Sequence, residues 1–294
     1  MKIFLIWEAI VGKEIFKFIG NTPLIRLYGF EKQKAIKARL FAKLEYMNPF
    51  GSIKDRAAYQ MILDAEKNGI LKADDEIIEA SSGNMGIALA AISQLKGYKC
   101  TIIMPDNMSE KRKELIKSYG AKLILSDAKH GMKGSIEMLE KLKNEHSFSP
   151  DQFNNASNAL AHYISTAREI DLSLKKGTDV IICGIGSGGT ISGLKKYFKN
   201  SEIIGVLPSS KDIIPGIGAG FTPHLVDKNT YKNAFEVTLQ ESIEARDCLL
   251  KTDGIFAGYS SGAVLSACEK VCQTKLYENM NIVLIFADSG ERYL

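Results

Sequence analysis

Apolar residues between positions 76 and 144 occur in short runs that alternate with longer stretches of helical spacing. The short runs predict strands at residues 77–79, 100–104 and 123–125. Stretches of helical spacing follow them, at about 85–95, 109–119 and 132–144. The strands lack alternation between apolar and polar positions, which is typical of a parallel sheet that helices cover on both faces.

The rest of the chain continues this pattern. Extended runs predict strands at residues 24–28 and 40–44, and a second series of alternating elements begins near Gln152. The second series predicts helices at about 159–175, 241–251 and 261–273, and another that follows the glycine-rich stretch and ends at Tyr197. It predicts strands at 180–183, 203–207 and 282–286. The pattern predicts an α/β protein with two three-layer αβα domains and mostly parallel sheets. A site is expected where the halves meet, at the carboxyl ends of strands.

The segment Asn48-Pro49-Phe50-Gly51-Ser52-Ile53-Lys54-Asp55-Arg56 predicts a loop that leads into a helix. Pro49 and Gly51 favour a turn, Ser52 is a suitable N-cap, and helical spacing continues until Gly69. Lys54 would therefore lie in the first helical turn, where the helix dipole disfavours a positive charge. A neutral amine there suits a lysine that forms a Schiff base, and a solvated surface lysine is the alternative for this stretch alone.

A glycine-rich loop, Gly184-Ile185-Gly186-Ser187-Gly188-Gly189-Thr190, lies between a predicted buried strand and a predicted helix. Its backbone N–H groups and the helix dipole favour an anion such as phosphate. The loop also satisfies the dinucleotide pattern G-x-G-x-x-G, but the next strand ends without the carboxylate that would hold a ribose. A P-loop would need lysine where Gly189 stands. The loop therefore indicates a phosphate without an attached ribose, and it has more glycines than a capping turn needs.

Two further loops carry hydroxyl groups beside predicted helix starts. Ser81-Ser82-Gly83-Asn84-Met85-Gly86 offers hydroxyls, an amide and N–H groups that suit a substrate carboxylate, with a plain polar turn as the alternative. Gly258-Tyr259-Ser260-Ser261-Gly262 matches the G-x-S-x-G of hydrolases, but all four histidines precede Ser260, against the order of that class. A helix cap is its structural alternative. Together with Lys54 and the phosphate loop, these loops match the needs of pyridoxal phosphate.

Composition narrows the possibilities further. The 38 basic and 34 acidic residues give a net charge of +4, and the basic residues are scattered, so no nucleic-acid partner is expected. Five cysteines without a C-x-x-C pair and four dispersed histidines predict no metal site, and Cys268 and Cys272 are interpreted as packing residues. The apolar segment 3–7 is too short for a signal sequence and no run could span a bilayer. A cytoplasmic location without membrane association is therefore expected.

Five ordered motifs between about Ile19 and Leu294 resemble the cysteine synthase (O-acetylserine sulfhydrylase) branch of fold-type II pyridoxal-phosphate enzymes. They are residues 48–56, 81–88 and 184–190, Gly216-Ile217-Gly218-Ala219-Gly220-Phe221, and Ser289-Gly290-Glu291-Arg292-Tyr293-Leu294. Threonine dehydratases share that fold, but their lysine motif resembles S-F-K-x-R-G and their substrate loop S-x-G-N-H-A, and this chain has neither. The resemblance implies a tryptophan-synthase-β-like fold. It further implies a small mobile substrate-binding domain at 48–155 and a large cofactor-binding domain at 1–47 and 156–294.

The resemblance also implies a role for each matching position. Lys54 would form the Schiff base with pyridoxal 5'-phosphate and later act as the base at Cα. Further cofactor contacts would come from Asn84 to the phenolic oxygen, Gly186, Ser187, Gly188, Gly189 and Thr190 to the phosphate, and Ser260 to the pyridine nitrogen. The substrate carboxylate would contact Ser81, Ser82, Asn84, Met85 (through its backbone) and Gln152, with the segment from Gly216 to Gly220 lining the entrance. A neutral serine makes the ring a weaker electron sink, which favours loss of a β-substituent.

The expected reaction is β-replacement through an α-aminoacrylate, making L-cysteine from O-acetyl-L-serine and sulfide. Ser81 and Met85 stand where the usual T-S-G-N-T-G loop has threonines, so other donors and nucleophiles stay open. One alternative takes L-cysteine, releases hydrogen sulfide and forms lanthionine or serine, and another takes O-phosphoserine. A non-enzymatic paralogue that binds the C-terminal tail of a partner is a third. The resemblance also implies a homodimer and names serine acetyltransferase as a candidate partner.

Overall fold

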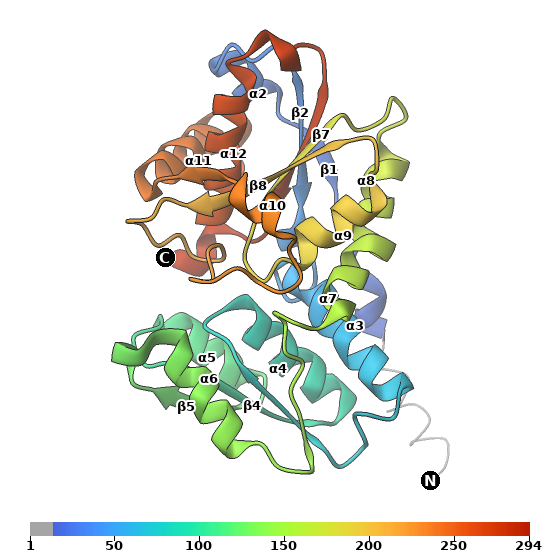
Figure 1. The fold of residues 1–294 in the computed structure, drawn as a ribbon, viewed down its shortest axis with the longest axis vertical. Helices are drawn as coiled ribbons and strands as arrows, with labels where there is room; N and C mark the ends of the chain where they lie inside the picture. The colour runs from blue at the N-terminus through green and yellow to red at the C-terminus, as the bar shows by residue number, and fades with distance from the viewer. Residues whose placement is uncertain (1–13) are drawn as a thin grey trace. The chain divides into compact units, whose positions relative to one another are not determined.

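The computed structural model describes residues 14–294, apart from the side chain of Lys275, so the apolar segment 3–7 lies outside the described part. Within that part the chain forms two compact units. The first comprises residues 14–20 and Asn48–Asp151, and the second comprises Asn21–Met47 and Gln152–Leu294. Each unit contains strands flanked by helices (Figure 1).

The first unit holds a four-stranded sheet in which every neighbouring pair is parallel. Its strands are, in spatial order, β5 (Lys122–Ser126), β4 (Lys99–Pro105), β3 (Glu76–Ala80) and β6 (Ser147–Phe148). Its helices are α3 (Lys54–Lys67), α4 (Asn84–Lys96), α5 (Glu110–Ser118) and α6 (Gly131–Leu142), with 3-10 turns η1 (Glu14–Phe18) and η3 (Ala128–His130).

Helices cover both faces of this sheet, as its uninterrupted apolar strands predict. Ile77 of β3 and Ile102 of β4 belong to a buried cluster with side chains of α3, α4 and α5. Their neighbours Ile78 and Ile103 belong to a separate cluster with Leu139 of α6. Successive side chains of a strand point to opposite faces, so a sheet buried on both sides needs apolar residues at consecutive positions.

The second unit holds a six-stranded sheet. Its strands are, in spatial order, β1 (Leu24–Arg26), β2 (Arg39–Leu44), β10 (Asn281–Phe286), β7 (Val180–Gly184), β8 (Glu202–Pro208) and β9 (Phe235–Val237). The β1–β2 pair is antiparallel and the other described pairs are parallel. The sheet therefore has the mostly parallel character that the sequence predicts.

Helices also flank the strands of the second unit. They are α2 (Tyr28–Gln33), α7 (Ala156–Ala161), the π-helical turn η4 (His162–Thr166), α8 (Ala167–Ser173), α9 (Gly189–Tyr197), α10 (Lys228–Lys232), α11 (Leu239–Asp253) and α12 (Tyr259–Cys272), with 3-10 turns η2 (Glu45–Met47), η5 (Lys275–Tyr277) and η6 (Gly290–Tyr293). Figure 1 shows α11 and α12 on one side of the strands and α8 and α9 on the other.

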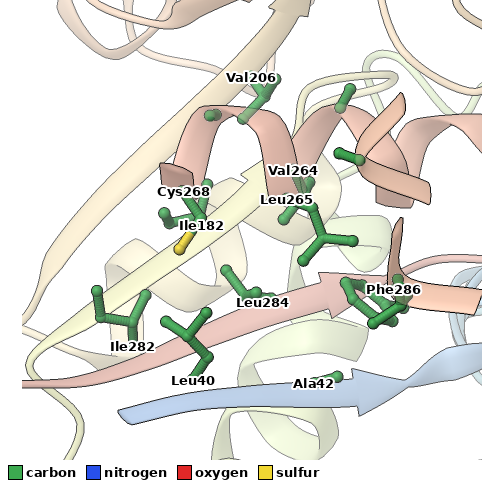
Figure 2. Close-up of a cluster of buried hydrophobic side chains, with 14 of the residues drawn as sticks. Leu40, Ala42, Ile182, Val206, Val264, Leu265, Cys268, Ile282, Leu284 and Phe286 are labelled. Atoms are coloured by element: carbon green, nitrogen blue, oxygen red, sulfur yellow. The ribbon is translucent and has the colours of Figure 1, made fainter. Parts of the chain in front are cut away.

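A buried apolar cluster joins this sheet to α12 (Figure 2). Its members include Leu40, Ala42, Ile182, Val264, Leu265, Ile282, Leu284 and Phe286. Cys268 lies among them with no exposed surface, and its Sγ is 3.9 Å from Sγ of Cys272. Both cysteines are free thiols, and Cys268 packs in the core as the sequence predicts.

The structure departs from the predicted elements in a few places. Tyr28, predicted to end a strand, begins α2 instead, and the hydrophobic pattern does not predict β6, β9 or α10. The helix predicted at 159–175 begins at Ala156, contains the π-helical turn and ends at Ser173. Very short elements and a single π turn leave no distinctive periodicity in a sequence, so the pattern could not predict them.

The two units also differ from the predicted domains at their boundaries. Residues 14–20 belong to the first unit rather than to the large domain. There Phe16 stacks on Tyr59 with ring centroids 4.9 Å apart, and N–H of Gly20 donates to Oδ1 of Asn48 at 2.8 Å. Residues 152–155 belong to the second unit rather than to the small domain, because Phe153 packs edge-on against Phe221. The roles and the mobility of the domains stay predictions.

Candidate active site

Lys54 is the first residue of α3, and its main chain is fixed by the residues before it. The hydroxyl Oγ of Ser52 accepts a hydrogen bond from N–H of Lys54 at 3.2 Å, but the N-cap of α3 is Ile53 rather than the predicted Ser52, and no side chain caps the helix. N–H of Phe50 donates to the carboxylate of Asp55 at 2.7 Å, which adds a second bond across the same turn. Ser52 and Asp55 have no exposed surface. These two bonds hold the main chain at the start of α3, from which the half-buried side chain of Lys54 extends.

The loop between β3 and α4 presents N–H groups at the N-terminus of a helix of 13 residues. Oγ of Ser81 accepts hydrogen bonds from N–H of Gly86 at 3.0 Å and from N–H of Gly83 at 3.4 Å. The side chain of Met85 is 2% exposed and belongs to the apolar cluster of the first unit. Met85 can therefore offer a ligand only its backbone, as the sequence analysis expects.

Arg112 of α5 lies against this loop, and the sequence analysis did not identify it. Its Nη1 donates to the carbonyl oxygen of Ser82 at 3.4 Å. The guanidinium carbon is 3.9 Å from the position that a Cβ on Gly83 would take. A fixed positive charge beside helix N–H groups favours an anion. No sequence signal pointed to Arg112, because the contact joins two elements that are distant in sequence.

The glycine-rich loop between β7 and α9 is shaped by close packing. Gly188 has φ of +88°, a conformation that glycine adopts without strain. A Cβ on Gly186 would lie 2.6 Å from the carbonyl oxygen of Gly216, and a Cβ on Gly189 would overlap the amide of Asn158. No side chain caps the start of α9, so its first N–H groups face the loop. The loop is therefore a cradle of backbone N–H groups that suits an anion.

Two buried polar side chains support this loop from behind. Nδ2 of Asn158 donates to Oγ of Ser187 at 2.9 Å and to the carbonyl oxygen of Gln152 at 2.7 Å. Nε2 of His162 lies 3.3 Å from Oγ1 of Thr190. Asn158 and His162 have no exposed surface. The sequence indicates no role for either residue, because only the fold brings α7 and the π-helical turn against the loop.

Ser260 lies in the first turn of α12, 3% exposed, and its Oγ has no hydrogen-bond partner in the described part of the chain. A Cβ on Gly216 would lie 3.6 Å from that Oγ. Gly216, Gly218 and Gly220 all have positive φ, and N–H of Gly218 donates to the carbonyl oxygen of Ile185 at 2.8 Å. Gly216 therefore lies between Ser260 and the glycine-rich loop.

The C-terminal segment fixes the turn that carries Ser260. N–H of Gly258 donates to the carbonyl oxygen of Asp288 at 3.0 Å, and the hydroxyl of Tyr293 donates to the Asp288 carboxylate at 2.6 Å. The ring of Tyr259 packs edge-on against that of Tyr293, with centroids 5.0 Å apart. A Cβ on Gly258 would overlap Oδ1 of Asp288, so glycine is required there. The sequence motif at 289–294 thus has a structural role.

Buried ionisable groups in the sheets show strong effects of desolvation. Burial raises the pKa of Glu79, on β3 just before the 81–86 loop, to about 8, although N–H of Asp151 donates to its carboxylate at 2.9 Å. Burial also raises the pKa of the Cys100 and Cys183 thiols to about 12, so neither is a ready nucleophile. The described residues contain no cluster of three or more His, Cys, Asp or Glu side chains suited to a metal ion.

The site residues predicted from the sequence fall into two groups. Lys54, Ser81, Ser82, Asn84 and Met85 belong to the first unit. Gln152, the residues from Gly186 to Thr190, Gly216, Gly220 and Ser260 belong to the second. Within the second unit the fold brings Gly186, Gly216 and Ser260 together and joins Ser187 to Gln152 through Asn158.

Comparison with known proteins identifies the family. The model of a family described as pyridoxal-phosphate dependent enzyme matches residues 15–288. A cysteine synthase of Staphylococcus aureus is 38% identical over 296 residues, which cover 95% of this chain and 94% of that protein. Among helices of residues 14–294, none has both the length and the apolar character that a membrane span requires.

Two solved structures match the fold with a TM-score of 0.89 each. One is a cysteine synthase from Entamoeba histolytica, with 37% identity over 95% of this chain and 88% of that chain. The other is a hydrogen sulfide-producing enzyme from Fusobacterium nucleatum, with 37% identity over 96% of this chain and 99% of that chain. The chain therefore belongs to the family of pyridoxal-phosphate-dependent enzymes, in the fold-type II branch that includes the cysteine synthases.

Proposed function

We propose that this enzyme makes L-cysteine from O-acetyl-L-serine and sulfide by replacing the β-substituent. The main support is the pairing of a glycine cradle with the buried hydroxyl of Ser260, which lacks a hydrogen-bond partner in the described part of the chain. A buried polar group without a partner is costly, so a ligand that supplies one is favoured. Relatives and structural neighbours named cysteine synthase support the choice of reaction.

The residues present fit pyridoxal phosphate. The cradle at 186–190 offers N–H groups without a side-chain cap, which suits a dianionic phosphate. Ser260 would face the pyridine nitrogen, Asn84 would contact the phenolic oxygen, and Lys54 would hold the aldehyde carbon. When bound, pyridoxal phosphate withdraws electrons from Cα of the amino acid, which labilises bonds at Cα and Cβ.

The side chains divide the remaining tasks. Lys54 would take the proton from Cα, and its main chain is held at the start of α3 by the bond from its N–H to Oγ of Ser52. Ser260 would be a neutral partner for the ring nitrogen, which would favour departure of acetate from Cβ over transamination. Sulfide would then form the new bond at the same carbon and Lys54 would return the proton to Cα, so one C–O bond is broken and one C–S bond is made.

The substrate carboxylate would bind at the 81–86 loop. The hydroxyl of Ser81 accepts hydrogen bonds from N–H of Gly83 and N–H of Gly86. Its own proton therefore points away from these two groups and can be donated to a carboxylate. Ser82, Asn84 and the backbone of Met85 would add donors, and Gln152 would supply an amide. Gly216 and Gly220 would line the entrance. We further propose that carboxylate binding draws the domain that begins at residue 48 closed over the substrate.

Borohydride trapping tests the proposal. Reduction of the holoenzyme should fix the cofactor on Lys54, found by mass spectrometry of the peptides. Lys54→Ala should lower kcat for cysteine formation by about a thousandfold, as expected for loss of a general base. Lys67→Ala, at the exposed end of the same helix, is the matched control and should keep full activity. A label on another lysine, or an active Lys54→Ala enzyme, contradicts the proposal.

A second reaction deserves a parallel assay because of Met85. The buried Met85 removes a hydroxyl from the usual substrate loop, and one structural neighbour is a hydrogen sulfide-producing enzyme. The alternative takes L-cysteine, releases hydrogen sulfide and forms lanthionine or serine. Sulfide release from L-cysteine should be compared with sulfide consumption in the presence of O-acetylserine or O-phosphoserine. The larger kcat/KM identifies the preferred donor.

We also propose that the enzyme acts as a homodimer and that serine acetyltransferase is a candidate partner. Both proposals rest on the likeness to cysteine synthases. Light scattering should give twice the chain mass. A peptide ending in a free carboxylate, matching the tail of the acetyltransferase, should compete with O-acetylserine for the 81–86 loop. A monomer, or a peptide that does not compete, contradicts the respective proposal.

A further inference from the structure

Asn158 is a fully buried amide that contacts the proposed phosphate loop from behind. Its Nδ2 donates to the carbonyl oxygen of Gln152 at 2.7 Å and to Oγ of Ser187 at 2.9 Å. A main-chain carbonyl can only accept, so the bond to Gln152 fixes which end of the amide is nitrogen. The amide therefore has one orientation, in which its nitrogen must donate toward Ser187.

The other end of the same amide is directed at the loop. Oδ1 of Asn158 has no hydrogen-bond partner in the described part of the chain. It lies so close to Gly189 that a Cβ on residue 189 would overlap it. Asn158 thus contacts two residues of the loop, Ser187 through its nitrogen and Gly189 through its oxygen.

The bond from Asn158 limits the directions in which the hydroxyl of Ser187 can donate. A serine hydroxyl has one proton and two lone pairs, and one lone pair accepts from Asn158. The proton is therefore directed away from Asn158. Ser187 is 4% exposed and belongs to the cradle at 186–190, where a hydroxyl that donates to a phosphate oxygen makes a charge-assisted bond.

We propose that Asn158 is a positioning residue that orients the hydroxyl proton of Ser187 toward the phosphate of the cofactor. Asn158 acts through Ser187 and does not itself touch the ligand. The inference rests on the proposed function, because it takes the loop at 186–190 as the phosphate site. Its distinctive consequence is that loss of the Asn158 donor weakens binding of the phosphate group and leaves the rest of the cofactor unaffected.

Asn158→Asp tests this with almost no change of shape. Aspartate lacks the N–H donors, so it would accept the proton of Ser187 and place a negative charge behind the loop. The dissociation constant of pyridoxal phosphate from the apoenzyme should rise by about tenfold or more, the size expected for one hydrogen bond to a charged group. The dissociation constant of pyridoxal, which lacks the phosphate, should stay within about twofold. Both are measured by absorbance titration.

A double-mutant cycle tests the route through Ser187. Ser187→Ala removes the hydroxyl that Asn158 is proposed to orient. In that background Asn158→Asp should weaken pyridoxal-phosphate binding less than it does in the native chain, because only repulsion between the new carboxylate and the phosphate is left once the hydroxyl of residue 187 is gone. If the two losses are instead additive, Asn158 does not act through Ser187 and the inference is wrong.

Asn281→Asp is a matched control. Asn281 is also a buried asparagine of the second unit, and its Nδ2 donates to a main-chain carbonyl oxygen, that of Gly177, at 2.7 Å. This variant should change the affinity for neither ligand, and apoenzyme melting curves report any loss of folding in both variants. Equal weakening of pyridoxal and pyridoxal phosphate by Asn158→Asp would show a merely structural role and overturn the inference.

The outcomes separate this inference from the proposed function. A native chain that binds no pyridoxal phosphate, or that consumes no β-substituted serine, sinks the proposed function. The other case is that the native chain is active while the Asn158→Asp variant keeps the full preference for pyridoxal phosphate over pyridoxal. That result would contradict only the role proposed for Asn158.

Discussion

Single residues in this chain owe their expected behaviour to burial more than to their chemical type. Ser260 is an ordinary serine by sequence. It becomes a candidate cofactor-binding residue because its buried hydroxyl has no hydrogen-bond partner in the described part of the chain. Met85 stands at the start of a polar loop, yet its side chain packs in the core. Glu79 is an acid whose surroundings oppose its ionisation. Each of these properties comes from the environment that the fold builds.

Glu79 predicts a specific dependence of stability on pH. Burial raises its pKa from 4.5 to about 8, so between these values the folded chain keeps a proton that the unfolded chain releases. The free energy of unfolding should therefore fall as pH rises, by about 1.4 kcal/mol per pH unit from this group. The contribution is fully present below pH 4.5 and is lost as pH rises through about 8.

Glu79→Gln should remove this slope while keeping an acceptor for N–H of Asp151. Urea unfolding at several pH values between 5 and 8 measures the difference between the variant and the native chain. The variant should gain relative stability steadily toward pH 8. Glu137→Gln, on the exposed face of α6, is the control and should follow the native curve. Parallel curves for Glu79→Gln and the native chain would contradict the raised pKa.

Helix termini show how local sequence contributes at the scale of the element. Thr238 precedes α11 and forms a full capping box: its Oγ1 accepts from N–H of Glu241 at 3.2 Å, and its N–H donates to the Glu241 carboxylate at 2.8 Å. Ser109 occupies the equivalent position before α5, but its side chain makes no capping bond. The two residues look alike in sequence and differ only in geometry.

Thr238→Ala should lower the free energy of unfolding by about 1 kcal/mol, because N–H of Glu241 loses its partner. Ser109→Ala should cost less than about half of that, since no capping bond is lost. Denaturant midpoints at constant m-value give both numbers. Equal losses in the two variants would show that the capping box does not contribute.

Elements with strong local signals were predictable, and those that depend on tertiary contacts were not. The apolar runs at β3, β4, β7 and β10 gave strands because a doubly covered sheet accepts only such runs. The glycines at 184–189 gave a loop between strand and helix. The support behind that loop was not predictable, because Asn158 and His162 reach it only through packing of α7 and the π-helical turn. The hydrophobic pattern places Asn158 just before the helix predicted at 159–175 and His162 inside it, and it indicates no role for either.

At the scale of the whole molecule, each unit has its own sheet and its own apolar cluster. Each can therefore satisfy its backbone hydrogen bonds and bury its apolar residues by itself. The family match extends over both units, from residue 15 to 288. The proposed site residues likewise come from both, which has a consequence for cofactor binding.

Pyridoxal phosphate should stabilise the whole chain and protect both units. At a concentration about 100 times its dissociation constant, a ligand that binds only the folded state adds about 2.7 kcal/mol, so the melting temperature should rise by about 5 °C or more. Hydrogen exchange measured by mass spectrometry should slow in peptides containing residues 81–86 and 186–190. Protection of the second peptide alone would contradict the assignment of Asn84 to the cofactor.

Because of the π-helical turn at His162–Thr166, the orientation of Asn158 depends on the number of residues in this stretch more than on their side chains. One residue of a helix corresponds to a rotation of about 100°. Removing a single residue from the turn would restore a regular helix, but it would rotate everything before the turn relative to Ala167 and Ile170, which are anchored in the core. Asn158 would then face away from Ser187. An exchange of side chains at Tyr163 or Ile164 would leave that geometry intact.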